Sequence, residues 1–213
     1  MPRTLSEDEV VGFRERLIDA AERLFAAHGL EAVTMRQLAA ELGVSPMTPY
    51  RYFADKDAIL AAVRARAFRR HAEALEAARA GKTTGVADSS NVSRAYVRFA
   101  LEHPQAYKLM FDVEQPNSGD YPELVAAGER SRGTMTAYLR DLIASGVLPA
   151  DADAELIGHM FWSALHGAIQ LQLAGYLNAP IDAERLCEAL VEAIWRGVLA
   201  THATGAKTAR RQV

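Results

Sequence analysis

The sequence predicts an all-α protein in two parts, a small N-terminal helical domain built around a helix-turn-helix and a larger helical domain behind it. Three observations predict this fold class. Apolar residues recur at helical spacing along most of the chain, no strand-like alternation of any length occurs, and residues 34–53 combine two helix starts with a tight turn. The 213 residues suffice for about nine helices and for a buried core in each part.

The stretch of residues 34–53 carries the sharpest local signals. Thr34 and Gln37 form a capping box, so the first helix has a defined start. Gly43 stands where a left-handed C-cap belongs, and Ser45 followed by a proline supplies the N-cap and first-turn residue of a second helix. Two short helices joined in this way make a helix-turn-helix.

Helices also flank this motif in the predicted first domain. Ser6 and Glu9 form another capping box, and a long amphipathic helix follows until Gly29. Asp55 caps a fourth helix after the motif. The segment 81–91, GKTTGVADSSN, is the most turn-rich of the chain, so we place the domain boundary between residues 1–80 and 81–213.

The second predicted domain is helical throughout. One stretch, Leu156 to Ile181, lacks charged residues but is interrupted by polar side chains at regular intervals, which indicates a buried helix rather than a membrane span. The helices of this domain are predicted over residues 92–103, 105–111, 121–145, 155–176 and 182–200.

Composition narrows the classes of protein without selecting one. The formal net charge of −3 does not indicate a nucleic-acid-binding protein, although a local surface can be basic in a neutral chain. Cys187 is the single cysteine, which excludes an internal disulfide framework and fits a reducing compartment. With no signal peptide at the acidic N-terminus, we expect a cytoplasmic protein.

Three segments of the first domain, AAHGLEAVT, MRQLAAELGVS and YRYFADKDAIL, resemble the TetR family of one-component transcriptional regulators. In the second domain Trp162, His166 and Gly167, within FWSALHG, resemble the WHG signature of one subgroup, as does HPQAYKLMF. The resemblance implies a ligand-responsive regulator. Such a protein acts most often as a repressor that binds a palindromic double-stranded DNA operator as a homodimer and is released by a small apolar or aromatic molecule.

A recognition helix of this kind reads base edges with its first turn, while hydroxyls, cations and helix N-termini contact phosphates. Tyr52 and Lys56 resemble the family's phosphate-contacting pair. Pro49 departs from the family pattern, because it removes the first intrahelical hydrogen bond, so we expect the recognition helix to start late or to bend. The candidate DNA-binding residues are Thr34, Arg36, Ser45, Pro46, Met47, Thr48, Tyr50, Arg51, Tyr52 and Lys56. The alternative for the two tyrosines is packing within the domain, and for Arg51 a solvated surface charge.

Rings and thioethers suited to an apolar ligand occur along the second domain, and plain core packing is the alternative for each of them. The candidate pocket residues are Tyr96, Phe99, Tyr107, Met110, Phe111, Met135, Tyr138, Phe161, Trp162 and His166. The resemblance places the dimer interface on the last two helices, where the candidates are Gly167, Ala168, Leu190, Ile194, Trp195 and Val198, with Gly158 and Ala164 allowing close approach.

Other functions have less support in the sequence. His159 and His166 lie on one helix face without a third ligand nearby, so we expect neither a metal site nor a cofactor. No nucleophile elbow, phosphate loop or paired-carboxylate motif occurs, so no catalytic residue is predicted. The alternative function is a helical ligand-binding or interaction protein that does not bind an operator.

Overall fold

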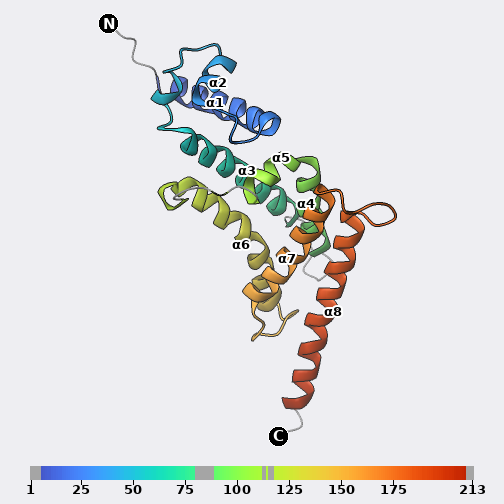
Figure 1. Cartoon of the computed structure of the whole chain (residues 1–213). Helices are drawn as coiled ribbons and strands as arrows, with labels where there is room; N and C mark the ends of the chain where they lie inside the picture. Colours follow the sequence, from blue (N-terminus) through green and yellow to red (C-terminus); the bar gives the residue numbers. More distant parts are fainter. Residues whose placement is uncertain (1–5, 80–88, 112–113, 115–117, 210–213) are drawn as a thin grey trace. The chain divides into compact units, whose positions relative to one another are not determined.

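The structure, a computed structural model, describes residues 6–79, 89–111, 114 and 118–209. These residues contain eight α-helices, two short 3₁₀ helices and no strand, which confirms the all-α prediction (Figure 1). The helices are α1 (Glu7–His28), α2 (Met35–Glu41), α3 (Lys56–Arg79), α4 (Ser89–Glu102), α5 (Pro104–Phe111), α6 (Pro122–Ala144), α7 (Ala154–Leu173) and α8 (Ala183–Ala209); the 3₁₀ helices are η1 (Pro49–Arg51) and η3 (Ser118–Asp120).

Eight α-helices stand where the sequence predicts about nine, because the second helix of the predicted helix-turn-helix is reduced to η1. The other predicted helices are present, and their ends agree closely except at α8. That helix continues to Ala209, beyond the predicted end near Ala200. None of the helices in the described part of the chain is long and apolar enough to cross a membrane.

The chain forms two compact units. Among the described residues, unit 1 comprises those within 1–69 and 105–128, and unit 2 comprises those within 70–104 and 129–213. The division falls inside α3, whereas the sequence places a domain boundary after Ala80, a residue outside the described part. The predicted boundary therefore stays a prediction.

Unit 1 is organised around apolar residues of α1, α2 and the start of α3, with Leu17, Leu38 and Leu60 fully buried at its centre. Arg66 of α3 also ties α1 to this core through ion pairs with Asp19 at 2.5 Å and with Glu22. Since the Arg66 side chain is largely buried, the pairs fix the register of the two helices more than exposed pairs would.

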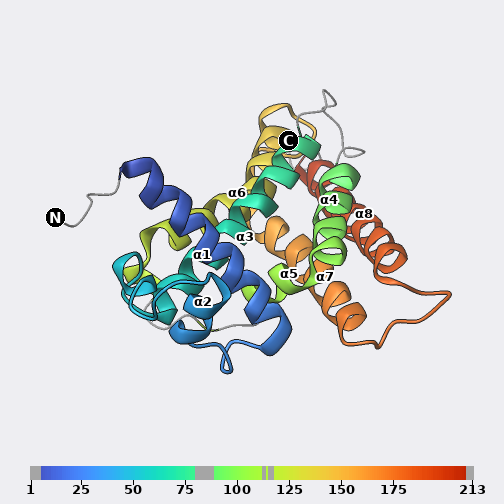
Figure 2. The same ribbon diagram turned by 90° about the horizontal axis from the view of Figure 1, so that it is seen from above.

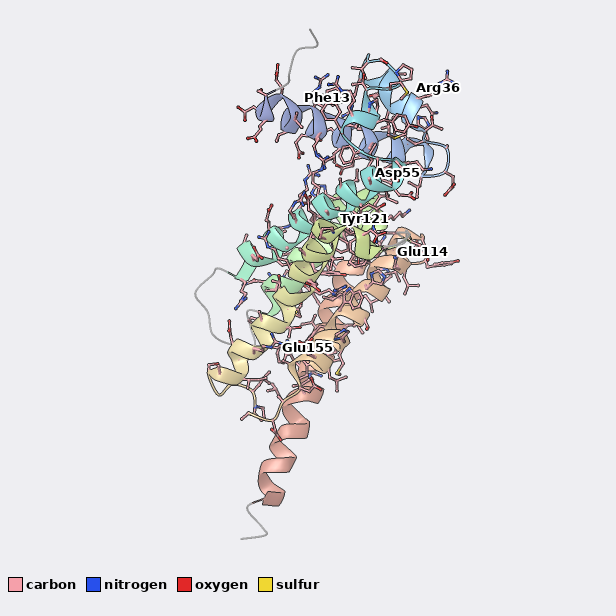
Figure 3. The ribbon with its side chains drawn as sticks, turned by 90° about the vertical axis from the view of Figure 1, so that its left-hand side faces the viewer. Phe13, Arg36, Asp55, Glu114, Tyr121 and Glu155 are labelled. Carbon is pink, nitrogen blue, oxygen red and sulfur yellow. The ribbon has the colours of Figure 1, made fainter. Side chains whose placement is uncertain are left out.

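The helix starts of unit 1 are those that local chemistry predicts. Ser6 accepts a hydrogen bond from the Glu9 amide at 3.2 Å and donates its own amide to the Glu9 carboxylate at 2.9 Å. Asp55 accepts from the Ala58 amide at 2.8 Å and so caps α3 (Figure 3). Gly29 ends α1 with φ of 79°, a conformation that favours glycine.

Unit 2 is built on α4, α7 and α8, which pack against one another (Figure 2). Fully buried residues on the three helices include Val92 of α4, Leu165 of α7 and Ala183 of α8. At Gly158 of α7 an added Cβ would lie 3.4 Å from Thr136 Oγ1 of α6, an ordinary van der Waals distance, so α7 packs against α6 at this position.

Candidate functional sites

The turn after α2 has the geometry of a Schellman motif. Gly43, with φ of 65°, donates its amide to the Ala40 carbonyl at 3.0 Å, and the Val44 amide donates to the Ala39 carbonyl at 2.9 Å. Thr34 caps the other end, because its hydroxyl accepts from the Gln37 amide at 3.3 Å while the Gln37 side chain accepts from the Thr34 amide at 2.8 Å. The first half of the predicted helix-turn-helix is thus confirmed.

The second half differs from the prediction of an α-helix starting at Ser45. The Thr48 amide donates to the Ser45 carbonyl at 2.8 Å and the Arg51 amide to the Thr48 carbonyl at 3.1 Å, both spanning three residues. An α-helix would need an amide at Pro49 to reach Ser45, and proline has none. The chain therefore forms a tight turn and then η1, in which Pro49 is buried. The disturbance expected from Pro49 is present, but as the loss of the α-helix and not as a late start or a bend, because only the three-residue η1 forms at Pro49–Arg51.

This turn presents several of the predicted DNA-binding side chains to solvent. Met47 is 67% exposed and Tyr50 is 48% exposed. Arg36 lies on the exposed side of α2 (Figure 3). Thr34, Ser45, Pro46 and Arg51 are also exposed, and Thr48 is half-buried.

Tyr52 and Lys56 are held by contacts within unit 1. The Tyr52 ring stacks on Phe13 with centroids 4.4 Å apart, and its carbonyl accepts from Arg14 at 2.6 Å. Lys56 donates to the Leu30 carbonyl at 3.2 Å. An ammonium has three donors, so this bond leaves Lys56 able to contact a phosphate as well.

The predicted pocket residues are distributed over both units. Tyr107, Met110 and Phe111 belong to unit 1, where Tyr107 and Phe111 have ring centroids 4.8 Å apart. The Met110 carbonyl there accepts from Arg64 at 3.0 Å. The candidates in unit 2 are Tyr96, Phe99, Met135, Tyr138, Phe161, Trp162 and His166.

Two unit 2 candidates, Tyr96 and Phe99, lie with His71 in a ring cluster, which we define by these three residues. The His71 ring lies edge-on to Tyr96 and Phe99, with centroids 4.8 Å and 5.0 Å away, and its Nδ1 lies 2.8 Å from Ser131 Oγ. Trp162 donates from Nε1 to the Tyr96 hydroxyl at 3.1 Å. All three ring-cluster residues are buried, so they form packed core.

The remaining candidates of unit 2 are also mostly core. Phe161 and Tyr138 are buried, Phe161 beside Trp195 with centroids 5.1 Å apart. Met135 and His166 are half-buried. His166 has its ring centroid 6.1 Å from that of Trp162.

His71 was not among the sequence candidates, although it is the polar centre of the ring cluster. Burial lowers the pKa of its imidazole from 6.5 to about 4, so the ring is neutral near pH 7. Its Nε2 has no hydrogen-bond partner among the residues that the structure describes. In the sequence His71 follows Arg69 and Arg70, which are expected on the solvent-exposed side of the helix, so the sequence does not indicate that His71 is buried.

A second apolar region of unit 2 is open instead of filled. A cavity of about 490 Å³ lies between α4 and α8, over a floor formed by Val97, Cys187, Val191 and Trp195. None of the predicted pocket residues lines this cavity, and only Trp195 was singled out for another role. We call it the α4–α8 cleft.

The predicted interface residues divide by burial. Ala168, Trp195 and Val198 are buried within the protomer, Leu190 and Ile194 are half-buried, and Gly167 is exposed. Gly158 also serves packing within the protomer, as described above, and Ala164 is half-buried. The exposed apolar and small residues of these two helices include Leu156, Met160, Gly167 and Leu171 on α7 and Ala189, Ala193, Gly197 and Leu199 on α8.

The two histidines of α7 have partners in their own helix. His159 Nδ1 lies 2.7 Å from the Glu155 carbonyl oxygen, and His166 Nε2 lies 3.5 Å from Gln170 Nε2. In the part of the chain that the structure describes, no group of three or more acidic, histidine or cysteine side chains is placed to hold a metal ion.

Comparison with known proteins identifies the family. Residues 17–63 match bacterial regulatory proteins of the tetR family, and residues 90–194 match the tetracyclin repressor-like C-terminal domain. The regulator BetI of Rhizobium meliloti is 31% identical over 174 residues, which cover 80% of this chain and 82% of BetI. The chain belongs to the TetR family. It is a DNA-binding transcriptional regulator and not an enzyme.

Other TetR-like proteins share this architecture. A structure of a protein of unknown function from Rhodococcus sp. RHA1 has 28% identity and a TM-score of 0.77, with 93% of this chain and 98% of that chain covered. The TetR family regulator PfmR from Thermus thermophilus, at 23% identity and a TM-score of 0.62 over 85% of this chain and 97% of PfmR, supports the fold alone.

Proposed function

We propose that this TetR-family regulator is a cytoplasmic repressor that binds a near-palindromic operator as a homodimer and releases it when a small, mainly apolar molecule binds unit 2. The observation that carries the proposal is the exposed turn after α2. There Met47, Tyr50 and Arg51 are exposed, and η1 packs against α2, whose N-terminus is capped by Thr34. Rings, hydroxyls and guanidinium groups of this kind bind phosphates and base edges.

The proposed operator contacts divide into two classes. Thr34, Arg36, Tyr52 and Lys56 contact the phosphate backbone, where a helix N-terminus adds a favourable dipole. The turn from Ser45 to Arg51 enters the major groove and contacts base edges. Because this turn is not a regular helix, its side chains project differently from those of an α-helix, and Met47 and Tyr50 at its exposed surface are the base-contacting candidates.

Dimerisation is proposed to use the exposed residues of α7 and α8. Leu156, Met160 and Leu171 leave apolar surface in solvent along one side of α7, with exposed fractions of 60%, 42% and 43%. The small residues Gly167 and Ala193 let a second copy of these helices approach closely. A two-fold dimer presents two turns to DNA and requires a near-palindromic site.

The test is an electrophoretic mobility shift with DNA from upstream of the protein's own gene, repeated at several salt concentrations. Lys56→Ala is expected to weaken binding and to reduce the slope of log affinity against log salt by about 0.9, the value for one lost phosphate contact. Tyr52→Phe is expected to weaken binding without changing that slope, since it removes a hydroxyl and no charge.

Arg132→Ala and Tyr176→Phe are the matched controls, because both side chains are exposed in unit 2 and neither belongs to the proposed operator contacts. Both controls are expected to bind as the unaltered protein does. If Lys56→Ala and Tyr52→Phe both bind with the affinity and the salt slope of the unaltered protein, the proposed phosphate contacts are wrong. No shift with any upstream fragment would leave the helical ligand-binding protein as the better description. Sedimentation of the complex gives the number of protomers per site.

A further inference from the structure

The α4–α8 cleft has the size and lining of a small-molecule site. Its volume of about 490 Å³ lies within the range of roughly 300–1,000 Å³ that is usual for ligand pockets. The floor is apolar, since Val97, Cys187, Val191 and Trp195 supply methyl groups, a thiol and an indole. Burial raises the pKa of the Cys187 thiol to about 11, so this group stays neutral and adds no charge to the floor.

One polar group in the cleft has no hydrogen-bond partner in the part of the chain that the structure describes. Ser93 of α4 lines the cavity, is only 4% exposed, and its Oγ makes no hydrogen bond. A buried hydroxyl without a partner costs roughly 1–3 kcal/mol. A ligand that accepts from or donates to this hydroxyl would remove the cost.

The walls of the cleft carry charges of both signs. Arg94 and Arg98 line it from α4, and Glu184, Glu188 and Glu192 line it from α8. The Glu192 carboxylate is also paired with Arg196 at 2.5 Å on its own helix. With positive and negative groups nearly balanced around an apolar floor, the cleft does not select an ion of either sign.

We infer that the α4–α8 cleft is the effector site, and that it takes an uncharged, mainly apolar molecule with a hydrogen-bonding group for Ser93. The inference rests on the proposed function, because it names the site and the ligand class for the same regulator. It places the ligand against α8 and not within the ring cluster, where the predicted pocket residues Tyr96 and Phe99 are packed core.

Because the cleft lies on α8, a bound ligand can affect the proposed dimer surface on the same helix. Cys187, Val191 and Trp195 recur every fourth residue along the side of α8 that faces α4. Ala189 and Ala193 are exposed on the other side of the same helix, in the proposed dimer surface. A ligand that shifts α8 therefore acts on the element that joins the two protomers, while leaving that surface uncovered.

The test uses N-phenyl-1-naphthylamine, an uncharged aromatic amine whose emission rises in apolar surroundings and whose single N–H matches the Ser93 hydroxyl. The full-length protein is titrated with the probe, which is excited directly so that tryptophan emission does not interfere. Val97→Phe and Val191→Phe each fill the cleft from a different helix. The matched control is Val147→Phe, because Val147 is 36% exposed and does not line the cleft.

Saturable probe binding is expected in the unaltered protein and in Val147→Phe, with at least roughly tenfold weaker binding in either filling variant. Thermal unfolding identifies any variant that fails to fold, and the remaining filling variant then decides the result. Filling variants that fold and bind the probe as tightly as the control would overturn the inference.

A second measurement needs no substitution in the cleft. Cys187 is the only cysteine of the chain, so mass spectrometry reports its alkylation by N-ethylmaleimide without interference. Saturating probe is expected to slow this alkylation at least fivefold, and an unchanged rate would overturn the site. Neither measurement involves DNA. Probe binding in the cleft together with a failed mobility shift would therefore refute the proposed repressor and keep the ligand site.

Discussion

Unit 2 contains two apolar regions that each bury a polar atom without a hydrogen-bond partner, and they differ in how fully they are filled. In the ring cluster, the unpartnered Nε2 of His71 is enclosed by Tyr96 and Phe99, whose rings lie 4.8 Å and 5.0 Å from its own. In the α4–α8 cleft, Ser93, whose hydroxyl has no partner among the described residues, is one of the residues that line a cavity of about 490 Å³. An unpaired atom in packed core costs stability alone, whereas one beside open space can also bind a ligand.

The ring cluster gives the largest expected effect, through the protonation of His71. Its pKa is about 4 in the folded protein and close to 6.5 in an unfolded chain. Between these values the unfolded chain binds a proton that the folded protein does not, so lowering the pH favours unfolding. We expect the free energy of unfolding to fall by about 3 kcal/mol from pH 6.5 to pH 4 through this group, at about 1.4 kcal/mol per pH unit.

The measurement is urea unfolding at several pH values and one protein concentration, compared with His71→Phe. That variant loses the imidazole and leaves the Ser131 hydroxyl without its partner, which lowers stability by an amount that does not depend on pH in this range. Its unfolding free energy is therefore expected to fall less steeply with acid. Equal slopes in the two proteins would show that His71 stays unprotonated or is not buried as described.

A pair of identical substitutions on α4 compares filled core with the cleft directly. Val92 and Val97 are 0% and 3% exposed, but only Val97 lines the cleft. Val92→Ala is expected to cost about 2 kcal/mol, since two methyl groups leave packed surroundings. Val97→Ala is expected to cost about 1 kcal/mol, because one side of that valine already lacks contacting atoms.

Chemical denaturation of the two variants at the same protein concentration supplies both values. Equal costs would mean that the cleft is closed in solution, and the case for a ligand there would fail with it. Adding N-phenyl-1-naphthylamine is expected to increase the stability of the unaltered protein by mass action.

The sequence predicts the parts of this structure that depend on local chemistry. The capping boxes at Ser6 and Thr34 and the positive φ at Gly43 follow from a few neighbouring residues, and all three are present. At Pro49 the missing amide predicts a disturbed helix, but how far the chain departs from it depends on the burial of that proline in unit 1. The exposure of the side chains in this turn could therefore be predicted better than the conformation of its backbone.

The ligand region could not be predicted in the same way. Helical spacing assigns Tyr96 and Phe99 to an inward face, yet it does not show whether the space opposite them is filled. The cleft arises because α4 packs beside α8, about ninety residues away in the chain, and its floor residues Val97, Val191 and Cys187 resemble ordinary core in sequence. Ser93 gives no signal either, since a serine on an amphipathic helix is usually solvated.

The smallest expected effect on stability is that of Ser93→Ala, and it separates the two regions most directly. Removing a buried hydroxyl that has no partner deletes a desolvation cost, so the free energy of unfolding is expected to stay the same or to rise by up to about 1 kcal/mol. Binding of N-phenyl-1-naphthylamine is expected to weaken about threefold to tenfold, since the probe loses a hydrogen bond worth roughly 0.5–1.5 kcal/mol.

Ser131→Ala is the matched control, because that hydroxyl lies 2.8 Å from His71 Nδ1. This variant is expected to lower stability and to leave probe binding unchanged. If the two serine variants behaved alike in both measurements, the ring cluster and the cleft would not be the different environments described above.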